Sequence, residues 1–102
     1  MASKKVVRLH EAALKEAQAA YDWYATRNPA AAEAFIDELD YAMRQIGMFA
    51  EAGPSHASGT RRYVMRRFPF TVIYRERQRT IEVIAVAHAR RKPGYWKERV
   101  KS

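Results

Sequence analysis

The sequence predicts one small α+β domain, in which a strand and two helices precede a three-stranded antiparallel meander. Apolar residues recur every three or four positions between Glu11 and Gly53, as they do along one face of a helix. After Gly59 they fall into three short stretches separated by turns, which is typical of strands. The chain has 102 residues, which is enough for one modest core and leaves little room for a second domain.

The first half predicts a strand followed by a helical hairpin. The β-branched stretch 6–9 is typical of a strand, and the helix from Glu11 has an apolar face formed by Leu14, Ala17, Tyr21 and Tyr24. Asn28 can cap a second helix and Pro29 is tolerated at its first position. The apolar face of that helix consists of Phe35, Leu39, Ala42 or Met43, Ile46 and Phe49. Gly53, in a left-handed conformation before Pro54, is expected to end it.

The second half predicts a loop at 55–59 and strands at 61–67, 70–75 and 81–87, with a break at 68–69 and a turn at 76–79. The stretch 81–87 is the most apolar of the chain, so we expect a central strand buried on both faces. A turn at Pro93 and Gly94 leads to a short helical tail at 95–100. The strand 6–9 should join the sheet beside the meander, and the hairpin should cover one face. Residues 1–5 are expected to be flexible.

Positive charge is concentrated in the second half. Residues 1–54 contain six Lys and Arg against eight Asp and Glu, a net charge of −2. Residues 55–102 contain thirteen against three, a net charge of +10. This asymmetry indicates an anionic partner, either nucleic acid or an acidic protein segment, and the alternative is a charge that serves only solubility.

Several kinds of site are excluded by the residues present. The sequence has no glycine-rich phosphate loop and no GxSxG motif. His10, His56 and His88 lack the spacing of metal ligands, so we expect neither a metal nor a cofactor. The absence of cysteine excludes disulfides. Because no apolar run approaches the roughly 20 residues of a membrane span and no apolar signal region follows the N-terminus, we expect a cytoplasmic protein without a membrane partner.

A basic and aromatic group remains as the candidate working surface. Arginine binds phosphate or carboxylate through two parallel hydrogen bonds, and a neighbouring Tyr or Trp can stack on a base. Taken singly, each aromatic residue of the group is more often part of the core than a ligand-stacking residue, but for the group as a whole we favour a function. We predict a target-binding set composed of Arg62, Arg66, His88, Arg90, Arg91, Lys92, Tyr95 and Trp96.

Two stretches of the second half resemble the RelE/ParE superfamily of bacterial toxins. Residues 66–75 read RRFPFTVIYR and residues 84–96 read IAVAHARRKPGYW. With the order of the elements, the helix opening at 11–13 and the junction Asn28-Pro29, the resemblance extends from Val6 to Arg99. It implies a single toxin domain of a type II toxin–antitoxin module, of the kind associated with plasmid stabilisation, and it favours the ParE-like branch.

The resemblance also implies protein partners. A cognate antitoxin would hold the toxin inactive in a hetero-oligomer, by folding a disordered segment onto the helix hairpin and the sheet. The residues expected to bind it are Leu14, Tyr21, Tyr24, Phe35 and Leu39. The target would be DNA gyrase for a ParE-like toxin and the ribosome for a RelE-like one.

Two activities are therefore open. RelE-like members cut mRNA on the ribosome without a metal, whereas ParE-like members inhibit gyrase and are not nucleases. For a metal-independent endoribonuclease, the resemblance assigns catalysis to Arg67, Arg90, Arg91 and Tyr95. Two arginines usual in the nucleases are replaced here by Thr71 and Ala89, although a one-residue shift in the alignment would supply Arg90. We favour a gyrase inhibitor over the endoribonuclease; an inactive member and a plain nucleic-acid-binding module are further alternatives.

Overall fold

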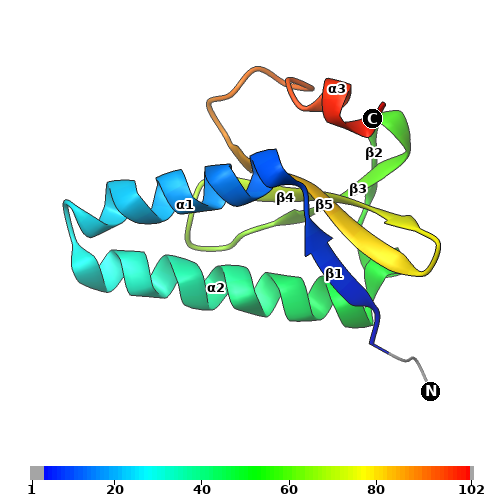
Figure 1. Cartoon of the computed structure of the whole chain (residues 1–102). Coiled ribbons are helices and arrows are strands. Elements are labelled where there is room, and N and C mark those ends of the chain that lie inside the picture. The colour runs from blue at the N-terminus through cyan, green and yellow to red at the C-terminus, as the bar shows by residue number, and fades with distance from the viewer. Residues whose placement is uncertain (1–3, 102) are drawn as a thin grey trace.

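In the computed structural model, which describes residues 4–101, a helical hairpin covers one face of a five-stranded sheet (Figure 1). The helices are α1 (Glu11–Ala25), α2 (Pro29–Met48) and α3 (Lys97–Val100), and the strands are β1 (Val6–Leu9), β2 (Ser55–His56), β3 (Thr60–Val64), β4 (Phe70–Arg77) and β5 (Thr80–His88). The strand order is β1-β5-β4-β3-β2, with β1 parallel to β5 and the other neighbours antiparallel. The predicted α+β class, the hairpin, the meander and the place of the first strand are thus confirmed.

The two long helices begin where the sequence predicts. Asn28 accepts a hydrogen bond from the backbone N–H of Ala31, and Pro29 occupies the first helical position. The buried face of α2 is the predicted one up to Ile46, with Ala42 at its centre, whereas Phe49 beyond the helix end is 52% exposed.

The buried face of α1 matches the predicted one only at Ala17 and at the partly buried Tyr24. Alanines at positions 13, 17 and 20 face the sheet, and Leu14 is 56% exposed. Small side chains let the backbone of a helix lie close to the layer beneath it, so the alanines take the inner face and the larger residues border it.

Gly53 does not have the role predicted for it. The helix α2 ends at Met48, a short 3₁₀ turn follows at Ala50–Ala52, and Gly53 has a φ of −68°, outside the left-handed region. Glycine is needed at this position because there is no space for a side chain. A Cβ atom at Gly53 would collide with the hydroxyl of Tyr74, which donates a 2.7 Å hydrogen bond to the carbonyl of Ala50.

Several strand boundaries in the second half differ from the predicted ones, and the turn expected at 76–79 is shortened because β4 runs to Arg77. The expected loop at 55–59 contains the two-residue edge strand β2, and the strand expected at 61–67 ends at Val64. Arg66 and Arg67 lie instead in the turn that leads to β4. The carboxylate of Glu38 accepts hydrogen bonds from both of their backbone N–H groups, so these groups do not pair with a neighbouring strand.

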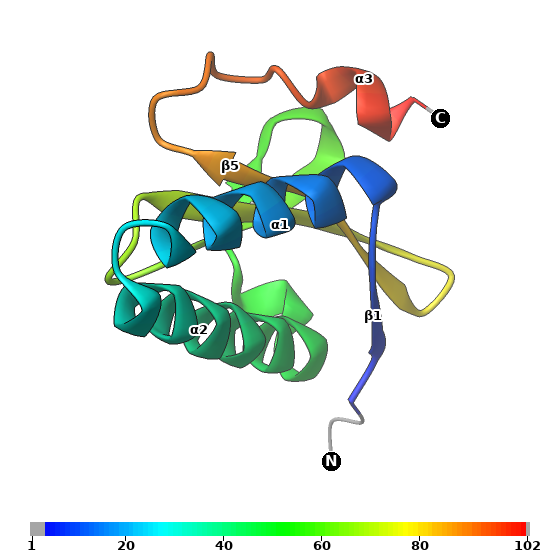
Figure 2. The ribbon, with the colours of Figure 1, turned by 60° about the vertical axis from the view of Figure 1, so that its left-hand side comes forward.

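The strand β5 is buried on both faces, as predicted, and a β-bulge determines which of its residues pack on which face of the sheet. Tyr74 pairs with Val83 and Ile73 pairs with Ala85, so Ile84 is the additional residue. Val83 then belongs to the core beneath the hairpin, while Ile84 and Ala85 both pack on the opposite face. The residues after β5 cover that opposite face, and they pass over the side of the sheet away from α2 (Figure 2).

The N-terminal approach to β1 is anchored at Lys5. Its backbone N–H donates a 2.9 Å hydrogen bond to the carbonyl of Gly47, and its ammonium lies 2.7 Å from the carboxylate of Glu76. Of the segment 1–5 that was expected to be flexible, residues 1–3 lie outside the described residues. Within residues 4–101, no helix is both long and apolar enough to cross a membrane.

Candidate functional site

The outer edge of β5 is closed by side chains where β1 stops. The strand β1 pairs with β5 only as far as Val83, and β5 continues to His88. Beyond that point the carboxylate of Glu16, on α1, accepts a 3.0 Å hydrogen bond from the backbone N–H of Val86. The guanidinium of Arg99 donates a 3.1 Å hydrogen bond to the carbonyl of Ile84 at the bulge. These side chains satisfy backbone groups that a neighbouring strand would otherwise have bound.

Glu16, Val86, Tyr95 and Arg99 form a cluster, which we call the Glu16 cluster. Two guanidinium nitrogens of Arg99 lie 2.9 and 3.0 Å from the two carboxylate oxygens of Glu16, in the forked geometry that strengthens such pairs. The hydroxyl of Tyr95 donates a 2.6 Å hydrogen bond to the same carboxylate. The side chains of Arg99 and Glu16 are only 18% and 15% exposed. The cluster therefore ties α1, β5 and the C-terminal segment together.

The cluster changes the proton affinities of its members. Burial by itself would raise the pKa of the Glu16 carboxyl, but hydrogen bonds from Arg99, Tyr95 and Val86 outweigh it and hold this pKa below its ordinary value. Burial and the Glu16 carboxylate raise the pKa of the Tyr95 hydroxyl well above its ordinary value. The Tyr95 hydroxyl is thus held protonated, as a hydrogen-bond donor.

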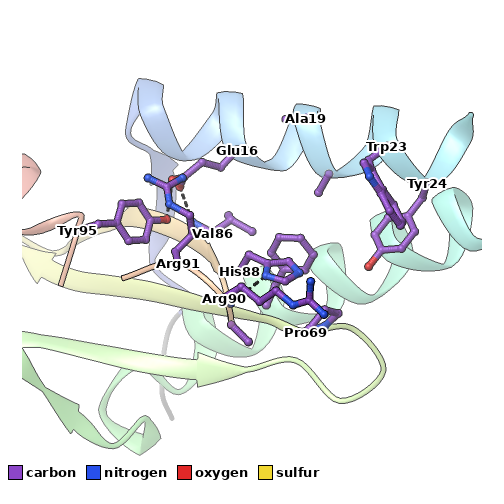
Figure 3. Close-up of a pocket in the computed structure, with 13 residues that line it drawn as sticks. Glu16, Ala19, Trp23, Tyr24, Pro69, Val86, His88, Arg90, Arg91 and Tyr95 are labelled. Carbon is purple, nitrogen blue, oxygen red and sulfur yellow. Dashed lines mark hydrogen bonds between the residues drawn. The ribbon is translucent and has the colours of Figure 1, made fainter. Parts of the chain in front are cut away.

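A cleft of about 780 Å³ lies beside the cluster, between α1 and the end of β5 (Figure 3). Tyr95 and Glu16 stand at one end, and Trp23 and Tyr24 at the other. Small and apolar side chains from α1 and the sheet form its floor. The cleft is lined by Glu16, Ala19, Ala20, Trp23, Tyr24, Pro69, Phe70, Val86, His88, Ala89, Arg90, Arg91 and Tyr95.

Arginines lie over aromatic rings that line the two ends of the cleft. The Cζ atom of Arg91 lies 3.8 Å from the centre of the Tyr95 ring, and that of Arg27 lies 3.9 Å from the centre of the Trp23 ring. A contact of this kind orients a guanidinium and leaves the edge of Arg91 able to bind an anion. The guanidinium of Arg27 also donates hydrogen bonds to the carbonyl of Trp23 and the hydroxyl of Thr26. Arg90 and Arg91 are the two arginines in the lining of the cleft.

The predicted target-binding residues are divided between two faces of the molecule. His88, Arg90, Arg91 and Tyr95 line the cleft. A second pocket of about 330 Å³, which we call the tail pocket, lies on the opposite side of the tail and is lined in part by Arg62, Thr71, Ala89, Lys92 and Trp96, with Arg91 and Tyr95 again at its wall.

Trp96 and Arg66 are placed differently from the rest of the predicted set. Trp96 is 3% exposed and packs against Ile73 and Ile84 in the core of the second face. The core reading of this residue is therefore confirmed. Arg66 lies in the turn before β4, outside both the cleft and the tail pocket.

The residues assigned to the nuclease alternative are also separated. Arg90, Arg91 and Tyr95 share the cleft, whereas the guanidinium of Arg67 lies 3.4 Å from the carboxylate of Glu38 in the turn before β4. Thr71 and Ala89, which stand where the resemblance expects arginines, line the tail pocket together.

The predicted antitoxin-binding residues lie mainly in a groove of about 360 Å³ on the outer side of the hairpin. We call it the hairpin groove; it is lined by Leu9, Leu14, Ala17, Gln18, Tyr21, Ile36, Leu39, Asp40 and Met43. Leu14 and Tyr21 are accessible there, and Leu39 lies at its base. Tyr24 lines the cleft instead. Phe35 is buried among Tyr24, Phe68 and Phe70 and offers no surface to a partner in this structure.

Sequence reasoning did not find Glu16, Trp23, Arg27 or Arg99. Glu16 stands between lysine and alanine on a helix, which is typical of a solvated position. Its partners Val86, Tyr95 and Arg99 lie 70 to 83 positions away along the chain, so no local sequence pattern indicates them. The four-residue step from Trp23 to Arg27 at the end of the first helix was the one available signal.

Comparisons with known proteins agree with this fold. The family model described as the ParE toxin of the type II toxin–antitoxin system parDE matches residues 7–93. A solved structure titled "Chromosomal ParDE TA system from P. aeruginosa" is similar to the chain with a TM-score of 0.73 and 20% sequence identity, over 83% of this chain and 96% of that one. A search of the curated proteins found no match. Since the family model covers most of the residues, the chain belongs to the family of ParE toxins of type II toxin–antitoxin systems.

Proposed function

We propose that this toxin acts by inhibiting DNA gyrase, as a binding protein and not as a nuclease, and that its action is cytoplasmic. The observation that carries the proposal is the hydrogen bond from the Tyr95 hydroxyl to Glu16. A ribonuclease would need a side chain there that can give or take a proton at the reacting oxygens. Tyr95 instead holds the C-terminal segment against α1. The pKa of its hydroxyl is raised, and the hydroxyl proton is hydrogen-bonded to the Glu16 carboxylate.

The tail pocket supports the same proposal. Thr71 and Ala89 bring neither charge nor proton-transfer groups to the place where the resemblance expects two arginines. An endoribonuclease has to stabilise the negative charge that develops on phosphorus, and arginine is the usual residue for that role. The basic surface that remains around Arg90 and Arg91 can bind an anionic protein surface without catalysing a reaction.

Neutralisation by the antitoxin is proposed to use the hairpin groove. A ParDE-type module supplies an antitoxin as partner, and Leu14 and Tyr21 present apolar surface between the two helices. An amphipathic helix from a segment that folds on binding can place its apolar side chains in such a groove. The expected assembly is a hetero-oligomer of toxin and antitoxin.

A supercoiling assay tests the gyrase proposal. Purified toxin is added to gyrase and relaxed plasmid, and we expect loss of supercoiling that the antitoxin restores. The same preparation is added to a translation extract, where we expect the mRNA to remain intact. Cutting of mRNA on the ribosome, with supercoiling unaffected, would contradict the proposal.

The endoribonuclease alternative keeps one observation in its favour, which is that Arg90, Arg91 and Tyr95 share one cleft. If the chain cuts mRNA, Tyr95→Phe and Arg91→Ala should each abolish cutting while the far-UV circular dichroism stays that of a folded protein. Undiminished cutting by both variants would exclude these residues from catalysis.

A further inference from the structure

We propose that the cleft binds an extended acidic segment of the target protein and takes one apolar side chain of that segment onto its floor. This inference rests on the gyrase function proposed above, because it specifies the chemistry of the part of that partner that the toxin holds. Three features of the cleft lead to it: the small side chains of its floor, the cations of its rim and the closed edge of β5.

The floor provides depth for one apolar side chain. Ala19 and Ala20 on α1 face Phe70 and Val86 of the sheet across the cleft. Because alanine ends at Cβ, the space of about 780 Å³ stays open between the helix and the strands. Ligand pockets commonly have volumes of roughly 300–1,000 Å³, so a leucine-sized or aromatic side chain and part of its peptide can enter.

The rim selects negative charge. Arg90 and Arg91 line the cleft, and Arg91 lies over the ring of Tyr95 at one end. Arg27 lies over the ring of Trp23, which lines the other end. The one carboxylate in the lining, that of Glu16, is already bound by the guanidinium of Arg99. The cleft therefore presents an excess of positive charge around an apolar floor. Glutamates or aspartates on either side of an apolar residue complement this arrangement.

The same contacts favour a peptide bound through its side chains over other occupants. Arg27 covers a face of Trp23 and Arg91 covers a face of Tyr95, which hinders the stacking of nucleobases on these rings. Addition of a partner strand to β5 is also blocked, because Glu16 binds the N–H of Val86. The peptide is therefore recognised through its side chains, by the apolar floor of the cleft and by the arginines Arg90 and Arg91.

Two substitutions at one position separate charge from size. Ala19 is exposed on α1 and lines the cleft, so it can be changed without disturbing the core. Ala19→Glu places a carboxylate in the cleft, whereas Ala19→Gln places a neutral side chain of the same size and similar helix propensity there. Arg90→Ala removes a rim cation, and Arg77→Ala removes an exposed arginine at the far end of β4 as its matched control.

Direct binding is measured with a capped synthetic peptide in which glutamates flank one phenylalanine. Trp23 lines the cleft and Trp96 is buried elsewhere, so a change in tryptophan fluorescence that Trp23→Phe abolishes reports on the cleft. We expect saturable binding that weakens with salt, at least tenfold weaker in Ala19→Glu than in Ala19→Gln. Arg90→Ala should weaken it severalfold, and Arg77→Ala should not. No binding, or binding that Ala19→Glu leaves unchanged, would overturn the proposal.

Inhibition of gyrase is then measured with the same variants. Inhibition that is at least tenfold weaker in Ala19→Glu than in Ala19→Gln supports the assignment of the cleft to the target. Full inhibition by both variants overturns that assignment while leaving the gyrase function intact. If the unsubstituted toxin does not inhibit gyrase, the proposed function fails, and the peptide titration still decides what the cleft binds. Charge-sensitive binding of a thymidine oligonucleotide in place of the peptide would contradict the inference.

Discussion

Replacement of Glu16 by glutamine should destabilise the protein strongly although it changes only one atom of the side chain. Glutamine keeps one oxygen that can accept from the N–H of Val86 or from the hydroxyl of Tyr95. It loses the negative charge that binds Arg99 through two contacts of 2.9 and 3.0 Å. The guanidinium would then remain largely buried without its carboxylate, since its side chain is only 18% exposed.

The size of the effect follows from the burial of the pair. Breaking a fully buried ion pair by removing one partner costs about 3–5 kcal/mol. Glutamine retains part of the hydrogen bonding and both side chains keep some contact with water, so we expect a loss of about 2 kcal/mol in the free energy of unfolding. In a domain of this size, 1 kcal/mol corresponds to roughly 4–8 °C, so the melting temperature should fall by about 8–16 °C.

Urea unfolding followed by far-UV circular dichroism measures this loss. The matched control is Glu11→Gln, because Glu11 is on the same helix and its ion pair with Lys15 is exposed. Loss of its charge in the first turn of α1 should cost less than about 1 kcal/mol. Glu16→Gln should also accelerate hydrogen exchange at the amide of Val86, and its effect should not add to that of Tyr95→Phe, since the two residues share one hydrogen bond. If Glu16→Gln is as harmless as Glu11→Gln, the Glu16 cluster does not hold the C-terminal segment.

Three further outcomes are expected. The folded protein holds the pKa of Glu16 below its ordinary value of 4.5, so the stability that this group contributes is fully present above about pH 4.5 and is lost as the pH falls toward the lower pKa of the folded state. Below pH 4.5, the free energy of unfolding should therefore fall less steeply with pH in Glu16→Gln than in the unsubstituted protein. Equal slopes would argue against the pairing. Trp96→Ala should cost about 3–5 kcal/mol in urea unfolding, since it empties the core of the second face, whereas Trp23→Ala, at a side chain that is 54% exposed, should cost far less. Leu14→Arg should leave the fold intact and weaken antitoxin binding, measured by titration calorimetry, by about tenfold or more, because an unpaired charge would enter the hairpin groove; unchanged affinity would mean that the antitoxin binds elsewhere.

The order and type of the elements could be predicted because they depend on neighbours along the chain. Asn28 and Pro29 begin α2 by local capping, and the apolar stretch 81–87 becomes the doubly buried β5. The first mistakes occur where a distant group competes with a local pattern. The alternation of 61–67 predicts one strand, but Glu38 takes the backbone N–H groups of Arg66 and Arg67, and β3 ends at Val64.

The candidate site was predicted only in part for the same reason. The sequence alone determined that a basic segment with tyrosine and tryptophan follows the last strand, and His88, Arg90, Arg91 and Tyr95 do share a cleft. The sequence could not determine which of these residues face a partner, because the bulge in β5 and the path of the C-terminal segment set the direction of each side chain.

The sequence by itself determined the architecture of this toxin and its concentration of positive charge, because helix periodicity, caps and turns act over a few residues. Only the tertiary structure decided what the basic segment can do. A hydrogen bond joins Tyr95 to Glu16 across 79 positions of the chain. It makes Tyr95, which was expected to bind the target and to serve catalysis only in the nuclease alternative, part of the support for the C-terminal segment. Such a contact exists only when α1, β5 and the segment after it are packed together, since packing brings the two side chains within reach and excludes water, which strengthens the hydrogen bond.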